Sequence, residues 1–121
     1  LIKHTHGLSK RKISQPLEYT LIIHELAVED ILEIARWYDL QSPGLGNRFE
    51  NHLEQCLERI FKNPAAHNSV TENTRKAYLK KIPYLVFFEL KVDIIHIYGV
   101  IHSKRNPVFM KERFKKINKH P

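Results

Sequence analysis

The chain has 121 residues, of which 42% are hydrophobic, and a formal net charge of +7. This length accommodates one domain with one core, and the apolar share is too high for a globally disordered chain. The single cysteine, Cys56, excludes a disulfide framework within the chain and favours a reducing compartment. No apolar run approaches the roughly 20 residues that a membrane-spanning helix needs, and no signal-peptide core follows the charged start. We therefore expect a cytoplasmic protein in which Cys56 is buried.

The charges are unevenly distributed along the chain. Residues 1–16 carry +4 and no acidic side chain, residues 17–73 carry −6, and residues 74–121 carry +9. Such an asymmetry indicates a face for a polyanion or, alternatively, a solvated lysine-rich surface. We expect residues 1–16 to form a basic leader outside the fold and residues 17–118 to form a single domain.

The N-terminal half of this domain predicts one strand and two helices. Residues 17–24 are rich in β-formers and alternate loosely, which is typical of a strand. From Val28 the apolar residues take helical spacing, at positions Val28, Ile31, Leu32, Ala35 and Tyr38. Ser42-Pro43-Gly44 ends this helix, and Asn63-Pro64 ends the next, whose apolar stripe consists of Leu45, Phe49, Leu53, Cys56, Leu57 and Ile60. Two amphipathic helices joined by a short connection predict an antiparallel hairpin that needs a second layer.

The C-terminal half predicts that second layer. We expect strands over residues 75–82, 84–90 and 94–102, with a hairpin turn at 91–93 and a basic helix over 108–117. Simple alternation in the last strand places two sets of side chains on opposite faces, namely Ile95, Ile97, Gly99 and Ile101 against His96, Tyr98 and His102. The element order is β-α-α-β-β-β with a terminal α. The fold class is therefore α+β, with the helical hairpin on one face of a mostly antiparallel sheet.

Several short motifs, in this order and spacing, resemble the RelE/ParE toxin superfamily. They cover about residues 17–115 and consist of Ala27 to Ile34, Arg48-Phe49, Asn63-Pro64, Arg75 followed eight residues later by Pro83-Tyr84, and Ile101 to Pro107. The resemblance implies a plasmid-stabilisation type of toxin, the growth-inhibiting half of a type II toxin–antitoxin pair, held inactive by an antitoxin encoded beside it. It leaves two targets open: ParE-like members block DNA gyrase, and RelE-like members cleave mRNA on the ribosome as mRNA interferases.

An RNA-cleaving member would be a metal-independent endoribonuclease. The ribose 2′-OH attacks the adjacent phosphate, so the protein must activate that hydroxyl, stabilise negative charge and protonate the leaving oxygen. Arg and Lys suit the second task, and His or Tyr suits the proton transfers. The candidate catalytic residues are Arg75, Lys81, Tyr84, His102 and Arg105, and the candidate target-binding residues are Lys80, Lys104, Lys111 and Arg113. A structural role for His102 and a solubilising role for the lysines are the alternatives.

One departure from the RelE-like pattern weakens the nuclease hypothesis. RelE-like nucleases tend to carry a tyrosine near the C-terminus, whereas this chain has Phe109 and Phe114, which transfer no protons. The remaining hypotheses are a non-catalytic nucleic-acid-binding module and a degenerate toxin that only binds its antitoxin. We expect no metal or other cofactor, since the histidines show no ligand spacing. Trp37 and Tyr38 on the acidic helix pair are candidates for antitoxin docking or self-association.

Overall fold

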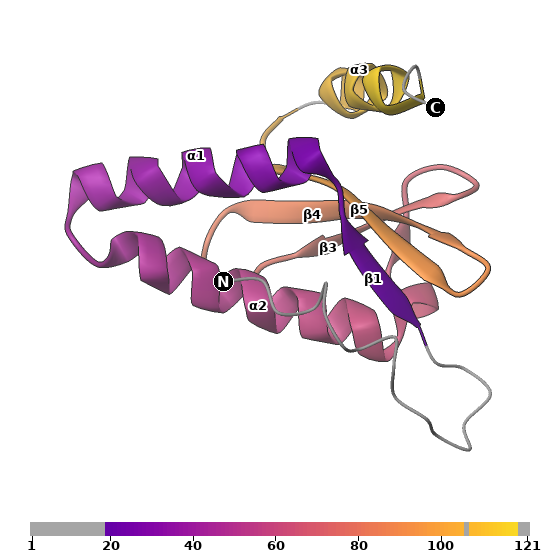
Figure 1. Ribbon diagram of the computed structural model, residues 1–121, viewed down its shortest axis with the longest axis horizontal. Helices are drawn as coiled ribbons and strands as arrows, with labels where there is room; N and C mark the ends of the chain where they lie inside the picture. Colours follow the sequence, from indigo (N-terminus) through magenta and orange to yellow (C-terminus); the bar gives the residue numbers. More distant parts are fainter. Residues whose placement is uncertain (1–18, 106, 119–121) are drawn as a thin grey trace.

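The structure is a computed structural model that describes residues 19–105 and 107–118. Figure 1 shows two long antiparallel helices lying across a sheet, with a third helix beyond it. The elements in chain order are β1 Thr20–Ile23, α1 Glu25–Gln41, α2 Leu45–Lys62, η3 Pro64–Ala66, β2 Asn68–Ser69, β3 Thr74–Tyr78, β4 Tyr84–Lys91, β5 Ile94–His102 and α3 Pro107–Asn118. The predicted α+β class is confirmed. The leader predicted at residues 1–16 lies outside the described residues.

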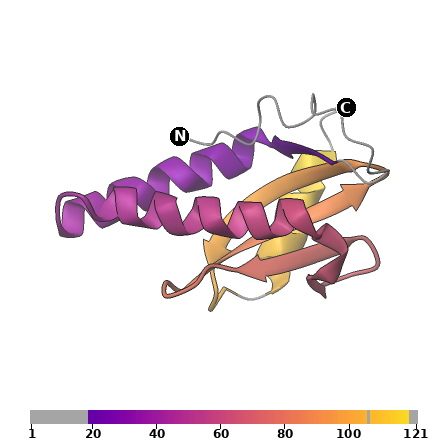
Figure 2. The same ribbon diagram turned by 90° about the horizontal axis from the view of Figure 1, so that it is seen from below.

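The described residues form a five-stranded sheet of order β1-β5-β4-β3-β2. Only the pairing of β1 with β5 is parallel, and the other three are antiparallel. The hairpin of α1 and α2 covers one face, and α3 lies on the opposite face (Figure 2). The sheet is therefore buried on both sides over its centre, which explains why β4 and β5 are mainly apolar rather than alternating.

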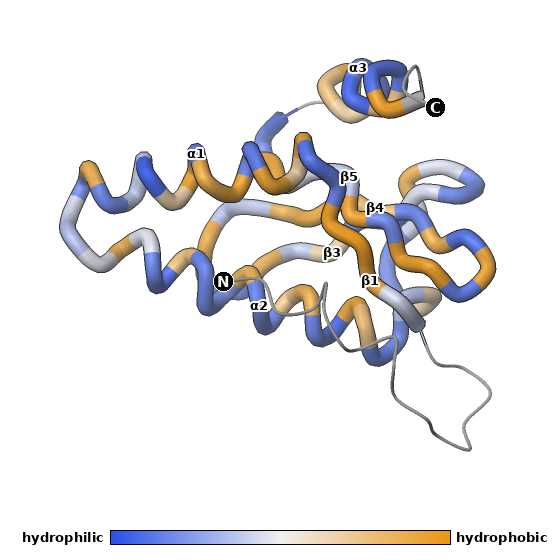
Figure 3. Tube along the Cα trace, in the orientation of Figure 1, coloured by the Kyte–Doolittle hydropathy of each residue, from blue (hydrophilic) through white to orange (hydrophobic). Residues whose placement is uncertain are grey.

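The stripe predicted for the second helix matches the buried face of α2. Phe49, Leu53, Cys56, Leu57 and Ile60 are almost fully buried, and alternating orange and blue segments mark the amphipathic helices in Figure 3. Burial of each Leu, Ile or Phe contributes roughly 1.5–3 kcal/mol. Cys56 is a core residue, as predicted, and burial raises the pKa of its thiol to about 11.

The first helix begins earlier than predicted, and its buried face differs. α1 starts at Glu25, and its fully packed positions are Ala27, Ile31 and Ala35. Val28 is 39% exposed and Leu32 55% exposed, although both belong to the apolar spacing that predicted this helix. The apolar stripe of this sequence is wider than the face that the sheet covers, and small alanine side chains, rather than the largest apolar ones, occupy the close contacts.

The connection between α1 and α2 depends on one aspartate and two glycines. Asp39 Oδ1 accepts hydrogen bonds from the backbone N–H of Gly44 at 3.2 Å and of Gly46 at 2.8 Å. Gly44 has φ +95°, and a Cβ on Gly46 would lie 2.7 Å from the carbonyl oxygen of Ala35. The two helices approach closely here because position 46 has no side chain.

A β-bulge changes which side chains share a face of β5. Phe88 pairs with Ile97 and Phe87 with Gly99, so Tyr98 is the additional residue. Beyond the bulge Val100 faces the hairpin and Ile101 faces α3. The predicted grouping of Gly99 and Ile101 with Ile95 and Ile97 was therefore wrong, since simple alternation fails at a bulge. His102 packs against Tyr84, which belongs to the hairpin side, and not with His96 and Tyr98.

The strand predicted over residues 75–82 is too long. β3 ends at Tyr78, because Leu79 turns back and its N–H donates to the carbonyl of Tyr84 at 2.9 Å. Lys81, in the following turn, has φ 70°. The strand bounds 94–102 and the C-terminal helix were predicted correctly, and α3 extends one residue further at each end. Among the described residues, no helix has both the length and the apolarity needed to cross a membrane.

Candidate functional site

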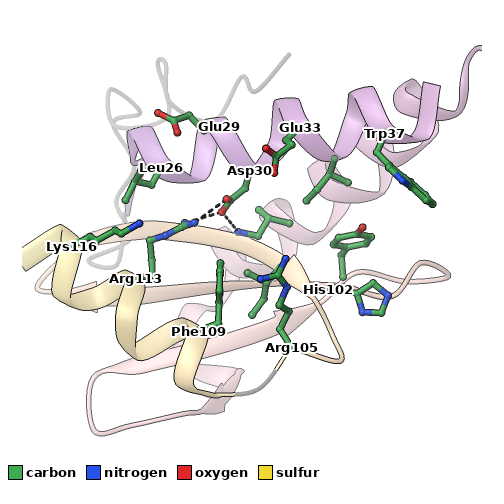
Figure 4. A pocket seen from close by; sticks show the side chains of 14 residues that line it. Leu26, Glu29, Asp30, Glu33, Trp37, His102, Arg105, Phe109, Arg113 and Lys116 are labelled. Atoms are coloured by element: carbon green, nitrogen blue, oxygen red, sulfur yellow. Dashed lines mark hydrogen bonds and ion pairs between the residues drawn. The ribbon is translucent and has the colours of Figure 1, made fainter. Parts of the chain in front are cut away.

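A groove of about 610 Å³ lies where α1, the end of β5 and α3 meet (Figure 4). α1 contributes one wall, α3 with the preceding loop contributes the opposite wall, and β5 contributes the floor. The lining residues are Leu26, Glu29, Asp30, Glu33, Ile34, Trp37, Tyr84, Val100, Ile101, His102, Arg105, Phe109, Arg113 and Lys116. Three of the five candidate catalytic residues, Tyr84, His102 and Arg105, are among them.

The groove exists because β1 is shorter than β5. β1 pairs with β5 only as far as Ile23 and Ile97, and no strand in residues 19–105 pairs with the rest of that edge. Two side chains take the place of the absent strand. The backbone N–H of Val100 donates to Asp30 Oδ2 at 3.0 Å, and Arg113 Nη1 donates to the carbonyl of Tyr98 at 3.0 Å.

Asp30 and Arg113 also bind one another. Arg113 Nη1 lies 2.8 Å from Asp30 Oδ2, and Nη2 lies 3.0 Å from Oδ1, a bidentate ion pair that joins α1 to α3. The Asp30 side chain is only 15% exposed and the Arg113 side chain only 10%. The pair bridges the α1 and α3 walls of the groove, and Arg113, predicted to bind a target, has its guanidinium engaged inside the protein.

The two walls carry opposite charge. Exposed Glu29 and Glu33 line the α1 side, while exposed Arg105 and Lys116 line the α3 side. The Arg105 guanidinium lies 4.6 Å from the centre of the Phe109 ring and extends into the groove (Figure 4). This stacking fixes the direction of Arg105 without neutralising its charge.

Tyr84 and His102 form the polar end of the groove. Their strands pair at this position, and their rings meet edge to face with centroids 5.2 Å apart. His102 Nδ1 accepts a hydrogen bond from the backbone N–H of Lys104 at 3.1 Å, so the neutral ring carries its proton on Nε2. Burial raises the pKa of the Tyr84 hydroxyl, with Tyr38 adding to the shift, so Tyr84 is a hydrogen-bond donor at neutral pH.

Arg75 lies elsewhere on the sheet. It pairs with Phe88, four residues along β4 from Tyr84, which corresponds to about 13 Å at 3.3 Å per residue. Its Nη1 donates to the carbonyl of His67 at 2.8 Å and to Ser69 Oγ at 3.2 Å. The structure thus does not bring Arg75 together with Tyr84 and His102.

The candidate lysines are dispersed. Lys80 and Lys81 are exposed in the turn between β3 and β4, Lys104 is exposed after β5, and Lys111 is exposed on α3. None of the four lines the groove. No group of three or more His, Cys, Asp or Glu side chains within the described ranges is arranged to hold a metal ion.

Sequence reasoning missed Asp30, Glu33 and Lys116 as groove residues. The partner of Asp30, Arg113, is 83 positions away in the sequence. The sequence shows only that Asp30 is an acidic residue next to the apolar stripe of a helix. This position alone does not identify its partner. Trp37, which was singled out, is 53% exposed at the rim, whereas Tyr38 is half-buried and stacks on Phe49.

The fold is shared with solved toxin structures. A chain from the chromosomal ParDE TA system of P. aeruginosa superposes with a TM-score of 0.64 at 16% identity, covering 71% of this chain and 97% of the other. The isolated RelE toxin of E. coli superposes with a TM-score of 0.54 at 18% identity, covering 82% and 98%. No curated protein sequence matches the chain.

These likenesses show the fold, and together with the family match over residues 21–107 they confirm the RelE/ParE toxin superfamily that the sequence motifs predicted. More closely, the chain belongs to the ParE toxin family of type II toxin–antitoxin systems, parDE, whose model matches residues 21–107. The match ends where α3 begins. The groove is therefore bounded by the family core on one side and by a C-terminal helix beyond the matched region on the other.

Proposed function

We propose that this toxin halts growth by inhibiting DNA gyrase in the cytoplasm, without a catalytic step of its own, and that a cognate antitoxin neutralises it. The observation that carries the proposal is that two of the five candidate nuclease residues, Arg75 and Lys81, lie apart from the groove that holds the other three. Phosphodiester cleavage needs a base, an acid and a cation around one phosphate. Here the backbone of Arg75 pairs about 13 Å along the sheet from Tyr84, its guanidinium is hydrogen-bonded to the carbonyl of His67, and Lys81 is exposed in a turn.

Two further features favour a non-nucleolytic toxin. Exposed Glu29 and Glu33 face the groove that holds Tyr84 and His102, and like charges repel a polyanion there. Phe109 and Phe114 are packing residues: Phe109 stacks with Arg105, and Phe114 meets Phe87 with ring centroids 5.6 Å apart. They supply no hydroxyl to the site.

The test is a supercoiling assay with purified gyrase and relaxed plasmid, run beside a translation assay with ribosomes and a defined mRNA. We expect the full chain to inhibit supercoiling and to leave the mRNA intact. The purified antitoxin should restore supercoiling at equimolar ratio. Cleaved mRNA with unaffected supercoiling would contradict the proposal.

The cluster of Tyr84, His102 and Arg105 favours a second candidate, ribosome-dependent mRNA cleavage. His102 would take or give a proton through Nε2, and Arg105 would stabilise the charge on the phosphate. Under this hypothesis His102→Ala and Arg105→Ala each reduce cleavage about 100-fold or more, the usual size of an acid–base contribution. Under the gyrase hypothesis mRNA remains uncut with either variant.

A further inference from the structure

The face of the sheet opposite the helical hairpin is only partly covered by α3. Phe87 of β4 meets Phe114 of α3 with ring centroids 5.6 Å apart, and Lys76 of β3 is the register partner of Phe87. Ala77 packs into the core on the hairpin side, so its neighbours Lys76 and Tyr78 point to the α3 side. Tyr78 is 46% exposed there. β3 thus lies about 5 Å beyond the strand that α3 covers, and the Tyr78 end of its α3-side face is open to solvent.

α3 carries two exposed lysines on the side of β4 and β3. Arg113 and Lys116 line the groove on the α1 side of this helix (Figure 4), and Phe114 packs on the sheet. At 3.6 residues per turn, Lys111 and Lys115 project from the flank away from α1, where β4 and β3 lie, and both are exposed.

These two lysines have little compensating charge on their own helix. The acidic residue of α3 is Glu112, whose Oε2 lies 3.9 Å from Lys115 Nζ. Both side chains of this pair are exposed, so water and salt screen it. The helix therefore keeps a net positive flank.

Further lysines lie at the end of the sheet where β3 stops and β4 begins. Lys80 and Lys81 are exposed in the turn between these strands, and Lys104 is exposed after β5. The two turns adjoin, because the backbone N–H of Ser103 donates to the carbonyl of Pro83 at 2.8 Å. We call the following side chains the basic face: Lys76, Tyr78, Lys80, Lys81, Lys104, Lys111 and Lys115.

The composition of the basic face favours phosphates over a protein partner. Lysine is depleted at protein–protein interfaces, whose centres gather apolar and aromatic anchors. Lysine ammonium groups are, by contrast, the usual contacts of sequence-independent binding to a nucleic-acid backbone. Lys76 Nζ lies 5.5 Å from the centre of the Tyr78 ring, and the Tyr78 hydroxyl is a donor for a phosphate oxygen.

The same residues favour a duplex over a single strand. Single strands are held by successive aromatic rings on which bases stack. Among the described residues, the exposed aromatic side chains are Trp37 and Tyr78, and Trp37 lies on α1. The basic face thus offers one exposed ring and six cations, which suits contact with a duplex backbone rather than with unstacked bases.

We propose that the basic face binds the backbone of duplex DNA without sequence preference. Lys111 and Lys115 are about 6 Å apart along α3 at 1.5 Å per residue, which spans about two phosphates of one strand at 3.4 Å each. Exposed Glu29 and Glu33 repel the DNA from the groove, so the duplex lies across α3 and β3 instead. The inference goes beyond the proposed function, because the face binds DNA whether or not gyrase is the target.

The test measures the affinity of the full chain for a short fluorescent duplex of random sequence, by anisotropy, from about 50 to 200 mM salt. Six lysine contacts should contribute about −5 to the slope of log K against log salt. In Lys111→Gln/Lys115→Gln the slope should become shallower by about 2, and binding near 100 mM salt should weaken about tenfold or more. Residues 1–16 are basic too, but their contribution is the same in every variant.

The matched control is Arg36→Gln/Lys62→Gln, which removes the same charge from exposed positions on α1 and α2. Its affinity should stay within about twofold of the wild type, since salt screens charges that lie more than about 10 Å from the DNA. Urea midpoints close to that of the wild type verify that both variants are folded.

Equal weakening in the lysine variant and its control would overturn the proposal, because binding would then follow net charge alone. Tighter binding of single-stranded RNA than of the duplex, measured by competition, would overturn it in favour of an RNA site. Tighter binding of polyglutamate would overturn it in favour of an acidic protein partner. The assay contains no gyrase, so absence of DNA binding would overturn this inference and leave the proposed function standing.

Discussion

Arg113 of α3 and Asp30 of α1 bind each other through two hydrogen bonds of 2.8 and 3.0 Å at the edge of β5 that no strand in residues 19–105 covers. Together they supply the acceptor for the Val100 N–H and the donor for the Tyr98 carbonyl. One ion pair thus satisfies two backbone groups at the edge of β5, joins two helices on different sides of the sheet and bridges the two walls of the groove. Such a strand edge otherwise invites pairing with another chain.

Removal of either partner should be costly. Asp30→Ala leaves a buried guanidinium without its carboxylate and the Val100 N–H without an acceptor, and we expect a loss of about 3 kcal/mol in the free energy of unfolding. Urea denaturation followed by circular dichroism measures it. The double variant Asp30→Leu/Arg113→Met should recover part of the loss, since it leaves no unpaired charge. A double variant as unstable as Asp30→Ala would contradict this account.

Gly99 should tolerate no side chain. A Cβ there would overlap the Phe87 ring and lie 2.9 Å from Arg113 Nη1. We expect Gly99→Ala to reduce the free energy of unfolding by about 2 kcal/mol, as overpacking of a core does. Gly44→Ala is the control, because no heavy atom lies within 4 Å and only the backbone φ of +95° opposes the change. Its cost should be about 1 kcal/mol, and a reversed ranking would exclude the packing explanation.

Local patterns predicted most of the fold, and non-local contacts explain what they missed. The α2 stripe and the bounds of β5 were correct because apolar spacing in these segments coincides with burial. The faces of β5 were wrong after Tyr98 because the bulge pairs Phe87 with Gly99, and such a shift between two strands is not visible in the alternation along one strand. The candidate groove residues Tyr84, His102 and Arg105 were identified from motifs, but the separation of Arg75 depends on strand register.

Stability should fall in mild acid because of two adjacent histidines. His24 Nε2 lies 2.9 Å from His96 Nδ1, so the pair needs at least one neutral ring. Burial lowers the pKa of both histidines below 6.5. The charges of His96 and Lys91 lower the pKa of His24 further. The charge of Lys91 also lowers the pKa of His96, whereas that of Glu89 raises it. A depressed histidine pKa means that the unfolded chain binds more protons, so stability is present above about pH 6.5 and declines as pH falls below it.

The measurement for the histidine pair is the urea midpoint between pH 7.5 and 5. It should fall with pH in the wild type, and the decline should be smaller in His24→Gln/His96→Gln, which removes both titrating groups. The double variant leaves the surroundings of the pair unchanged, namely Tyr98, whose hydroxyl donates to Glu89, and Lys91, which forms an ion pair with Glu89. An unchanged pH dependence in the double variant would assign the acid sensitivity to other groups.

Cys56 offers a probe of opening between α2 and β3. It is the only cysteine of the chain; its side chain is fully buried, and its Sγ lies 3.8 Å from the carbonyl of Ala77. Burial raises the pKa of the thiol to about 11, so at pH 8 only about one thiol in a thousand is a thiolate, and that fraction lies out of reach of a reagent. We expect the native chain to react with a thiol-specific disulfide reagent only during opening, and the urea-unfolded chain to react within seconds. If the native and unfolded chains react at similar rates, α2 does not cover the sheet as the structure shows.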